Sequence, residues 1–161
     1  MNITISSSDI RDYVASHLRE VFATMLSLEA ESVAVVGPEA FGGEHVTGSV
    51  GIAGAKVTGS VYLHISSPFA VQATVTMLGL PPEEIPAPAD INDVVAEVTN
   101  MIGGGLKSWL CDAGALCVLT TPAVIRGTSF AIKPRQGVEV IQAGFLCAGS
   151  SGLVEIHIKF Q

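Results

Sequence analysis

The sequence predicts an α+β fold, in which an antiparallel sheet carries two long helices and a shorter one. Residues 6–28 and 90–112 both space their apolar side chains as amphipathic helices do. Short apolar segments joined by turn residues follow each of these stretches, and the last one, 153–160, alternates apolar with polar side chains. Helices and strands segregated in this way favour helices that cover one face of an antiparallel sheet.

The first predicted helix has the most regular pattern in the chain. Serines at 6–8 offer several possible N-caps, because a serine oxygen can accept from the free N–H groups of the first turn. Apolar side chains then recur at the i, i+3, i+4, i+7 positions of one helix face: Ile10, Tyr13, Val14, Leu18, Val21, Phe22, Met25 and Leu26.

Residues 45–66 predict two strands and a turn. A short apolar run at 32–37 precedes them, and glycine and lysine at 54–56 provide the turn. The tetrapeptide Thr-Gly-Ser-Val occurs at 47–50 and again at 58–61. We interpret this as two similar strands of one hairpin rather than as a repeat architecture.

A shorter helix should follow, with Ser67 as its N-cap, Pro68 at the first helical position and Gly79 at its end. Residues 80–90 contain four prolines and therefore predict a stiff connector that is neither helix nor central strand. We expect Asp90 to cap the next helix.

After Asp112 the sequence returns to β-structure. Further strands are expected within the segments 116–127, 129–134, 138–148 and 153–160, the last two joined as a hairpin. In the final segment every second residue is apolar. We therefore expect the face of Ile156 to be buried and the face of Glu155 and His157 to be wet.

Composition indicates one domain over residues 1–161 and excludes several function classes. Hydrophobic residues make up 48% and charged residues 14%, which excludes a disordered chain. The net charge of −7 disfavours nucleic acid and anionic membrane as partners. No apolar run is long enough to span a membrane, and the first twelve residues lack the features of a signal peptide. We therefore expect a cytoplasmic protein.

Cysteines and histidines give no sign of a metal or a disulfide framework. Cys111, Cys117 and Cys147 form no C-x-x-C pair, so we interpret them as reduced core residues. The four histidines show no ligand spacing, and His17 lies on the apolar stripe of its helix, as a core histidine would. We expect no metal site built by this chain alone.

The helix at 90–112 presents an unusual polar side. On a helical wheel, five residues lie within about 80° of one another on the side away from the apolar stripe: Asp93, Glu97, Asn100, Gly104 and Lys107. Glu97 and Asn100 are three apart and hence neighbours, and Gly104 follows Asn100 at i+4. Gly104 exposes backbone there, which allows another molecule to approach closely.

Glycine also stands at the two positions that flank Gly104. Gly105 falls on the apolar side, where we expect it to let the helix lie tight against the sheet, whereas Gly103 has no assigned role. Each glycine costs about 1 kcal/mol relative to alanine in a helix interior. Two readings of the polar side remain open at this point: a docking surface, or a solvated face with small residues selected for packing.

The stretch from Asp93 to Pro122 resembles the signature of the CheC/CheX family of chemotaxis phosphatases. In that signature an acidic or serine residue is followed by Glu four residues later, by Asn three after that, and by a proline about two dozen residues on. Here these positions are Asp93, Glu97, Asn100 and Pro122, the proline one residue early. Residues 48–68 also resemble the family's hairpin leading into a helix, and 122–127 the stretch after the signature helix.

The resemblance implies dephosphorylation of the aspartyl-phosphate of the response regulator CheY. Asn100 would align the attacking water, and Glu97 would pair with the regulator's lysine that contacts the phosphoryl group. Asp93 would be a secondary contact, and Gly104 and Lys107 would complete the partner-binding surface. The partner would supply Mg²⁺, so this chain would need no cofactor of its own. An amide suits this role, because catalysis of phosphoryl transfer is mostly positioning and charge stabilisation.

One site of this kind is expected, which is the CheX pattern rather than the two-site CheC pattern. In the first helix Glu20 is followed three residues later by Ala23, so the amide is missing there. The resemblance also implies a homodimer formed through sheet edges. The alternative function is a catalytically silent CheX-like module that binds receiver domains or other signalling partners through the same face.

Other enzyme classes fit the sequence poorly. The Lys-Ser pair at 107–108 follows glycines as in a P-loop, but Leu106 interrupts the required Gly-Lys and the segment lies inside a helix pattern. No G-x-S-x-G nucleophile elbow occurs in the chain. Cys111 ends an apolar stripe without a nearby histidine, and such buried thiols are usually inert.

Overall fold

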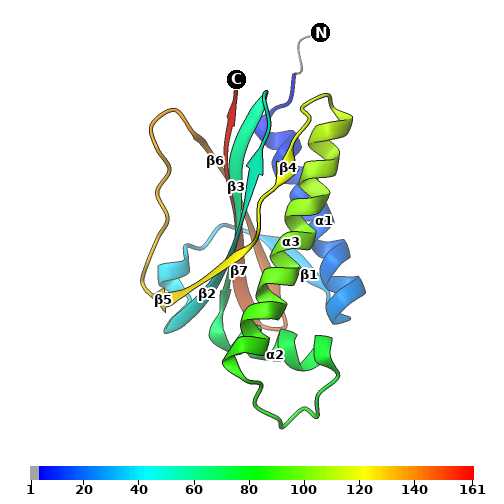
Figure 1. Cartoon of the computed structure of the whole chain (residues 1–161). Coiled ribbons are helices and arrows are strands. Elements are labelled where there is room, and N and C mark those ends of the chain that lie inside the picture. The colour runs from blue at the N-terminus through cyan, green and yellow to red at the C-terminus, as the bar shows by residue number, and fades with distance from the viewer. Residues whose placement is uncertain (1–3) are drawn as a thin grey trace.

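A computed structural model describes residues 4–161 (Figure 1). The expectation that the first twelve residues are not a signal peptide rests partly on residues 1–3, which lie outside this range. The described residues form three α-helices, one short 3₁₀-helix and seven strands. In chain order these are α1 Ser7–Leu26, β1 Ala30–Val33, η1 Pro38–Ala40, β2 Glu44–Ala53, β3 Val57–Ser66, α2 Ser67–Leu78, α3 Pro88–Asp112, β4 Val118–Leu119, β5 Ala123–Thr128, β6 Glu139–Cys147 and β7 Ser150–Phe160. The predicted α+β class is confirmed.

All strand pairs are antiparallel, in the order β1-β6-β7-β3-β2-β4, with β5 also paired to β2. The two predicted hairpins are β2–β3 and β6–β7. Val50 of the first Thr-Gly-Ser-Val copy pairs with Val61 of the second, as expected for similar strands of one hairpin. Figure 1 shows α1 and α3 side by side on one face of the sheet, with α2 across its end.

The core fills the space between these helices and the sheet. Most of the apolar stripe of α1 is buried as predicted, and Phe22 in its C-terminal half packs against Phe69 of α2 and Phe145 of β6. From α3, Val98, Ile102 and Leu106 are buried in the same core. No helix of the described residues is both long and apolar enough to cross a membrane.

The start of α1 agrees with the prediction, whereas the caps of α2 and α3 differ from it by one and three residues. Ser6 caps α1 in a capping box with Asp9, within the predicted serine cluster. Ser66, not Ser67, caps α2, so Pro68 takes the second helical position and not the first. Asp90 does not cap α3, because Pro88 already begins the helix, where the missing proline N–H costs nothing.

Three predicted strands change in the fold. Strand β1 covers 30–33 rather than the apolar run 32–37, and the segment 129–134 forms no strand. That segment belongs to the long connection that crosses from β5, at one side of the sheet, to β6 near the other. The third change is in β7, which lies between β3 and β6 and is buried on both faces, so Glu155 and His157 are not wet.

Candidate functional site

Small residues hold α3 close to its neighbours at three places. A Cβ on Gly48 of β2 would lie 1.9 Å from the Thr99 hydroxyl oxygen, so the glycine gives that buried threonine its space. A Cβ on Gly103 would lie 2.6 Å from Val50 of β2, and one on Gly105 would lie 2.1 Å from the His17 ring of α1. Gly103 therefore packs on the sheet.

The expectation that Gly105 packs on the sheet is wrong, because that side of α3 faces α1 instead. The His17 ring occupies the space and its Nε2 lies 3.0 Å from the carbonyl oxygen of Met101. Tyr13 completes the contact, because its hydroxyl donates to the carbonyl of Gly105 and its ring stacks on Trp109. His17 is thus a partly buried packing residue, as its position on the stripe predicted.

The predicted site residues share the side of α3 that faces away from the core. Asp93 and Glu97 are exposed, whereas Asn100, Gly104 and Lys107 are half-buried. Within residues 4–161 none of their side chains makes a hydrogen bond or an ion pair. The Asn100 amide and the Glu97 carboxylate therefore have all their hydrogen-bonding capacity free for another molecule.

Gly104 is the open member of the glycine run. A Cβ built on it would meet only Leu119 of β4, at an ordinary contact distance of 3.9 Å. The backbone beside Asn100 is therefore accessible on one side and bordered by strand β4 on the other. Pro122, the last residue of the signature, is half-buried directly before β5 and so lies at this same sheet edge.

Sequence reasoning missed one positioning residue, Arg126 of β5. Its guanidinium donates to the Asn92 side-chain oxygen, with the Nε contact at 3.1 Å, and to the carbonyl of Pro88. It also lies 3.8 Å from the carboxylate of Glu44 on β2. These contacts tie the first turns of α3 to the sheet edge. Local sequence patterns could not predict these contacts, because Arg126 and Asn92 are 34 residues apart in the chain.

Two of the three thiols, those of Cys117 and Cys147, occur in surroundings that favour the neutral form. Burial raises the pKa of Cys147, and it raises that of Cys117 to about 11, with Cys111 adding to the effect. All three cysteines are free. Cys117 and Cys147 are buried in the core, as expected from the sequence, whereas Cys111 is half-buried. Among residues 4–161 no group of three or more His, Cys, Asp or Glu is placed to hold a metal ion.

A polar cluster lies on the other face of the sheet. Glu155, only 8% exposed, accepts from the Gln142 amide at 2.7 Å and from His157 Nε2 at 3.1 Å. Burial raises the pKa of Glu155, but these contacts and the nearby His64 ring outweigh it and lower the pKa overall. The cluster is remote from the polar side of α3.

Comparison with known proteins assigns this architecture to a known family. Residues 46–146 match the family model described as chemotaxis phosphatase CheX, and no curated protein matches the chain. The chain is 25% identical to the chemotaxis protein CheX from Vibrio vulnificus, with a TM-score of 0.81 over 97% of this chain and 100% of the other. For CheX from Desulfovibrio desulfuricans the identity is 26% and the TM-score 0.78, over 94% and 99%.

A third similar structure contains a partner. It is the CheX–CheY–BeF3–Mg²⁺ complex from Borrelia burgdorferi, 22% identical, with a TM-score of 0.74 over 97% of this chain and 99% of the other. At this identity the likeness establishes a shared fold. The predicted family resemblance and fold are confirmed by these matches together.

Proposed function

This chain belongs to the CheX family of chemotaxis phosphatases, and we propose that it removes the phosphoryl group from the aspartyl-phosphate of a CheY-like response regulator. It acts as a single domain over residues 1–161, in the cytoplasm, where it meets that regulator. The observation that carries the proposal is the unengaged Asn100 amide, placed beside Glu97 and open backbone on the outer side of α3.

Asn100 is the residue that positions the water. Its amide can donate and accept hydrogen bonds at once, and no group within residues 4–161 competes for it. Inserted into the regulator's site, it orients a water in line with the bond between phosphorus and the aspartyl oxygen. The water oxygen bonds to phosphorus, the aspartyl oxygen leaves as carboxylate, and inorganic phosphate is released. Most of the catalysis is positioning.

Glu97 orients the complex. Its exposed carboxylate pairs with the regulator's lysine that contacts the phosphoryl group, and such a charge-assisted contact gives register and specificity. Asp93, one turn earlier, makes a weaker contact at the rim. The Mg²⁺ required for the reaction belongs to the regulator, so it is part of the substrate complex and not a cofactor of this chain.

Gly104 and Lys107 complete the docking surface. The open backbone at Gly104 lets the regulator approach Asn100 without displacing a side chain. Close approach matters here, because a displacement of about 1 Å can cost about 10²-fold in rate. We also propose that two copies of the chain associate through sheet edges, as the family resemblance implies.

The decisive experiment follows the decay of a phosphorylated CheY-like regulator with Mg²⁺, with and without this protein. We expect faster release of phosphate, abolished in Asn100→Ala, while binding to the phosphorylated regulator largely persists. Ser108→Ala, on an exposed position of the same helix, is the matched control and should retain activity. Binding without accelerated release would instead establish the silent receiver-binding module.

A further inference from the structure

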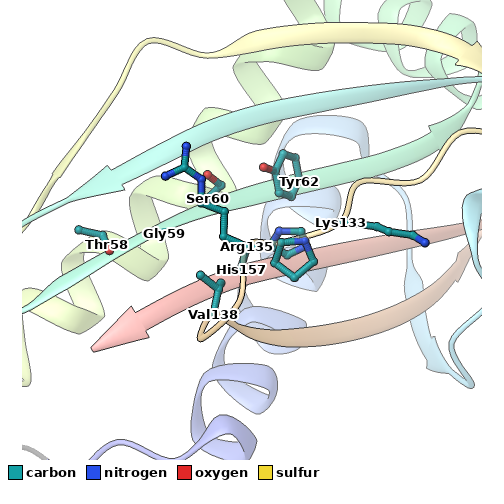
Figure 2. Close-up of a pocket in the computed structure, with 9 residues that line it drawn as sticks. Thr58, Gly59, Ser60, Tyr62, Lys133, Arg135, Val138 and His157 are labelled. Atoms are coloured by element: carbon teal, nitrogen blue, oxygen red, sulfur yellow. The ribbon is translucent and has the colours of Figure 1, made fainter. Parts of the chain in front are cut away.

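A groove of about 340 Å³ lies on the face of the sheet opposite the helices. Its walls come from β3, β7 and the connection that leads from β5 to β6 (Figure 2). Side chains that line it include Ser60, Tyr62, Lys133, Arg135, Val138 and His157. The two β3 residues alternate with buried Val61, which points into the core, so they face away from α1 and α3.

Two cationic residues border this groove although the chain is acidic. The protein has only 8 Lys and Arg against 15 Asp and Glu, and two of those cations, Lys133 and Arg135, line the groove. Neither side chain makes a hydrogen bond or an ion pair within the described part of the chain. By contrast, Arg19 bonds to Ser32 and Arg126 to Asn92. An unpaired cation beside a concave site, as Arg135 is, attracts anions.

A histidine, His157, also lines the groove, and a hydrogen bond to Glu155 fixes the orientation of its ring. Glu155 accepts from Nε2 of His157, which turns the other ring nitrogen, Nδ1, away from that carboxylate. Gln142 bonds to the second oxygen of Glu155, and His64 lies 3.7 Å from the first. Both oxygens of the Glu155 carboxylate therefore already have partners within the protein. In Figure 2 the Arg135 side chain extends from the connection toward Ser60, with His157 and Tyr62 beside it, whereas Lys133 points away.

We propose that this groove binds a small organic anion. Arg135 presents a planar fork that suits a phosphate or carboxylate group, and Ser60 and His157 supply further hydrogen bonds to it. Tyr62 and Val138 contact the apolar part of the same ligand. The volume lies at the small end of the range for small-molecule sites. This site is separate from α3 and does not depend on the phosphatase proposal.

Calorimetric titration of the full chain with phenyl phosphate and with benzoate tests the site and distinguishes the two head groups. We expect saturable binding of at least one of them, tighter than that of the uncharged benzyl alcohol. Arg135→Gln should weaken this binding at least tenfold. Arg11→Gln, which removes the same charge from α1 on the opposite side of the sheet, should leave it unchanged.

The proposal is overturned if neither anion binds saturably to the natural protein. It is also overturned if Arg135→Gln binds as tightly as the natural protein, or if Arg11→Gln loses as much affinity. Unfolding curves of both variants serve as the folding check, and both should match the natural protein, because neither arginine is buried. Even if a variant fails this check, titration of the natural protein still decides whether the protein binds such an anion, and absence of binding overturns the proposal.

Discussion

Gly103 of α3 and Val50 of β2 lie so close that a Cβ on the glycine would be 2.6 Å from the valine Cγ1. The next residue, Gly104, has no such neighbour, and its nearest contact would be Leu119 at 3.9 Å. Two adjacent glycines of one helix therefore serve different purposes. The first permits packing on the sheet and the second leaves backbone open to solvent.

Alanine at these two positions should change stability in opposite directions. Gly103→Ala forces a Cβ against buried Val50, and such overpacking costs about 1–3 kcal/mol. Gly104→Ala meets open space and should raise the free energy of unfolding by up to about 1 kcal/mol, because alanine favours the helix. Urea unfolding of both variants checks this. Equal effects would show that packing does not separate the two positions.

A bulky residue at position 104 should block the regulator without unfolding the protein. Gly104→Leu covers the backbone beside Asn100, so we expect at least a tenfold loss of phosphatase activity. The melting temperature should not fall, since the position faces outward. Activity with phosphorylated regulator and thermal unfolding are measured on the same sample. Gly104→Ala, the smaller change, should lose much less activity, and a fully active leucine variant would contradict docking at this face.

Glu97 and Asn100 should affect different kinetic parameters. Glu97→Gln removes the charge that pairs with the regulator's lysine, so we expect KM to rise several-fold with a smaller change in kcat. Asn100→Ala should lower kcat with little change in KM. Steady-state measurements at several regulator concentrations separate the two. Asp93→Asn is the charge-matched comparison and should have the weaker effect of a rim contact, whereas an effect equal to that of Glu97→Gln would contradict the assigned roles.

His45 should make the protein less stable in mild acid. Its side chain is 0% exposed, its two ring nitrogens have no hydrogen-bond partner among the described residues, and its ring stacks on Phe130. Burial lowers the pKa of His45, nearby His64 lowers it further, and Glu39 opposes the shift. Below about pH 6.5 the unfolded chain binds a proton that the folded protein does not. The free energy of unfolding therefore decreases as the pH is lowered.

Denaturant unfolding at pH 7.5 and pH 5.5 measures this loss. We expect the natural protein to be less stable at pH 5.5, and His45→Leu to reduce the difference between the two pH values. Glu155 does not contribute to the difference in stability between pH 7.5 and pH 5.5, because its pKa is lowered. Its stabilising contribution is therefore lost only below the usual glutamate range of about 4.3. An unchanged difference in the leucine variant would assign the acid sensitivity to another group.

The two sheet edges should mediate association of two copies. Strand β1 forms one edge and exposes Val33, and at the other edge β4 exposes Val118 and β5 exposes Ile125, which is 41% exposed. Light scattering after size exclusion should give the mass of a dimer at micromolar concentration. Lysine in place of Val33, and separately of Ile125, identifies the edge that is used, because an edge charge opposes pairing. A monomer in the natural protein would contradict the prediction.

Local patterns predicted most elements because each depends on nearby residues. The stripe of α1, the hairpin of β2 and β3, and the polar side of α3 follow from helix and strand periodicity. Errors arose where neighbours distant in sequence decide the outcome. Glu155 was expected to be wet because alternation describes one strand, whereas its burial depends on β3 and β6 pairing on both sides of β7 and on what covers that face.

The sequence by itself determined the helices, most of the strands and the family resemblance. It also determined the single pair of Glu97 and Asn100 on one side of a helix. Tertiary structure alone decided which glycine is packed and which is open, since Val50 and His17 reach α3 from other elements. It also brought Arg126 to the start of α3, and Arg135 to the groove beside His157. Periodicity specifies the direction of a side chain within its own element, but the partner that it meets depends on how the chain packs.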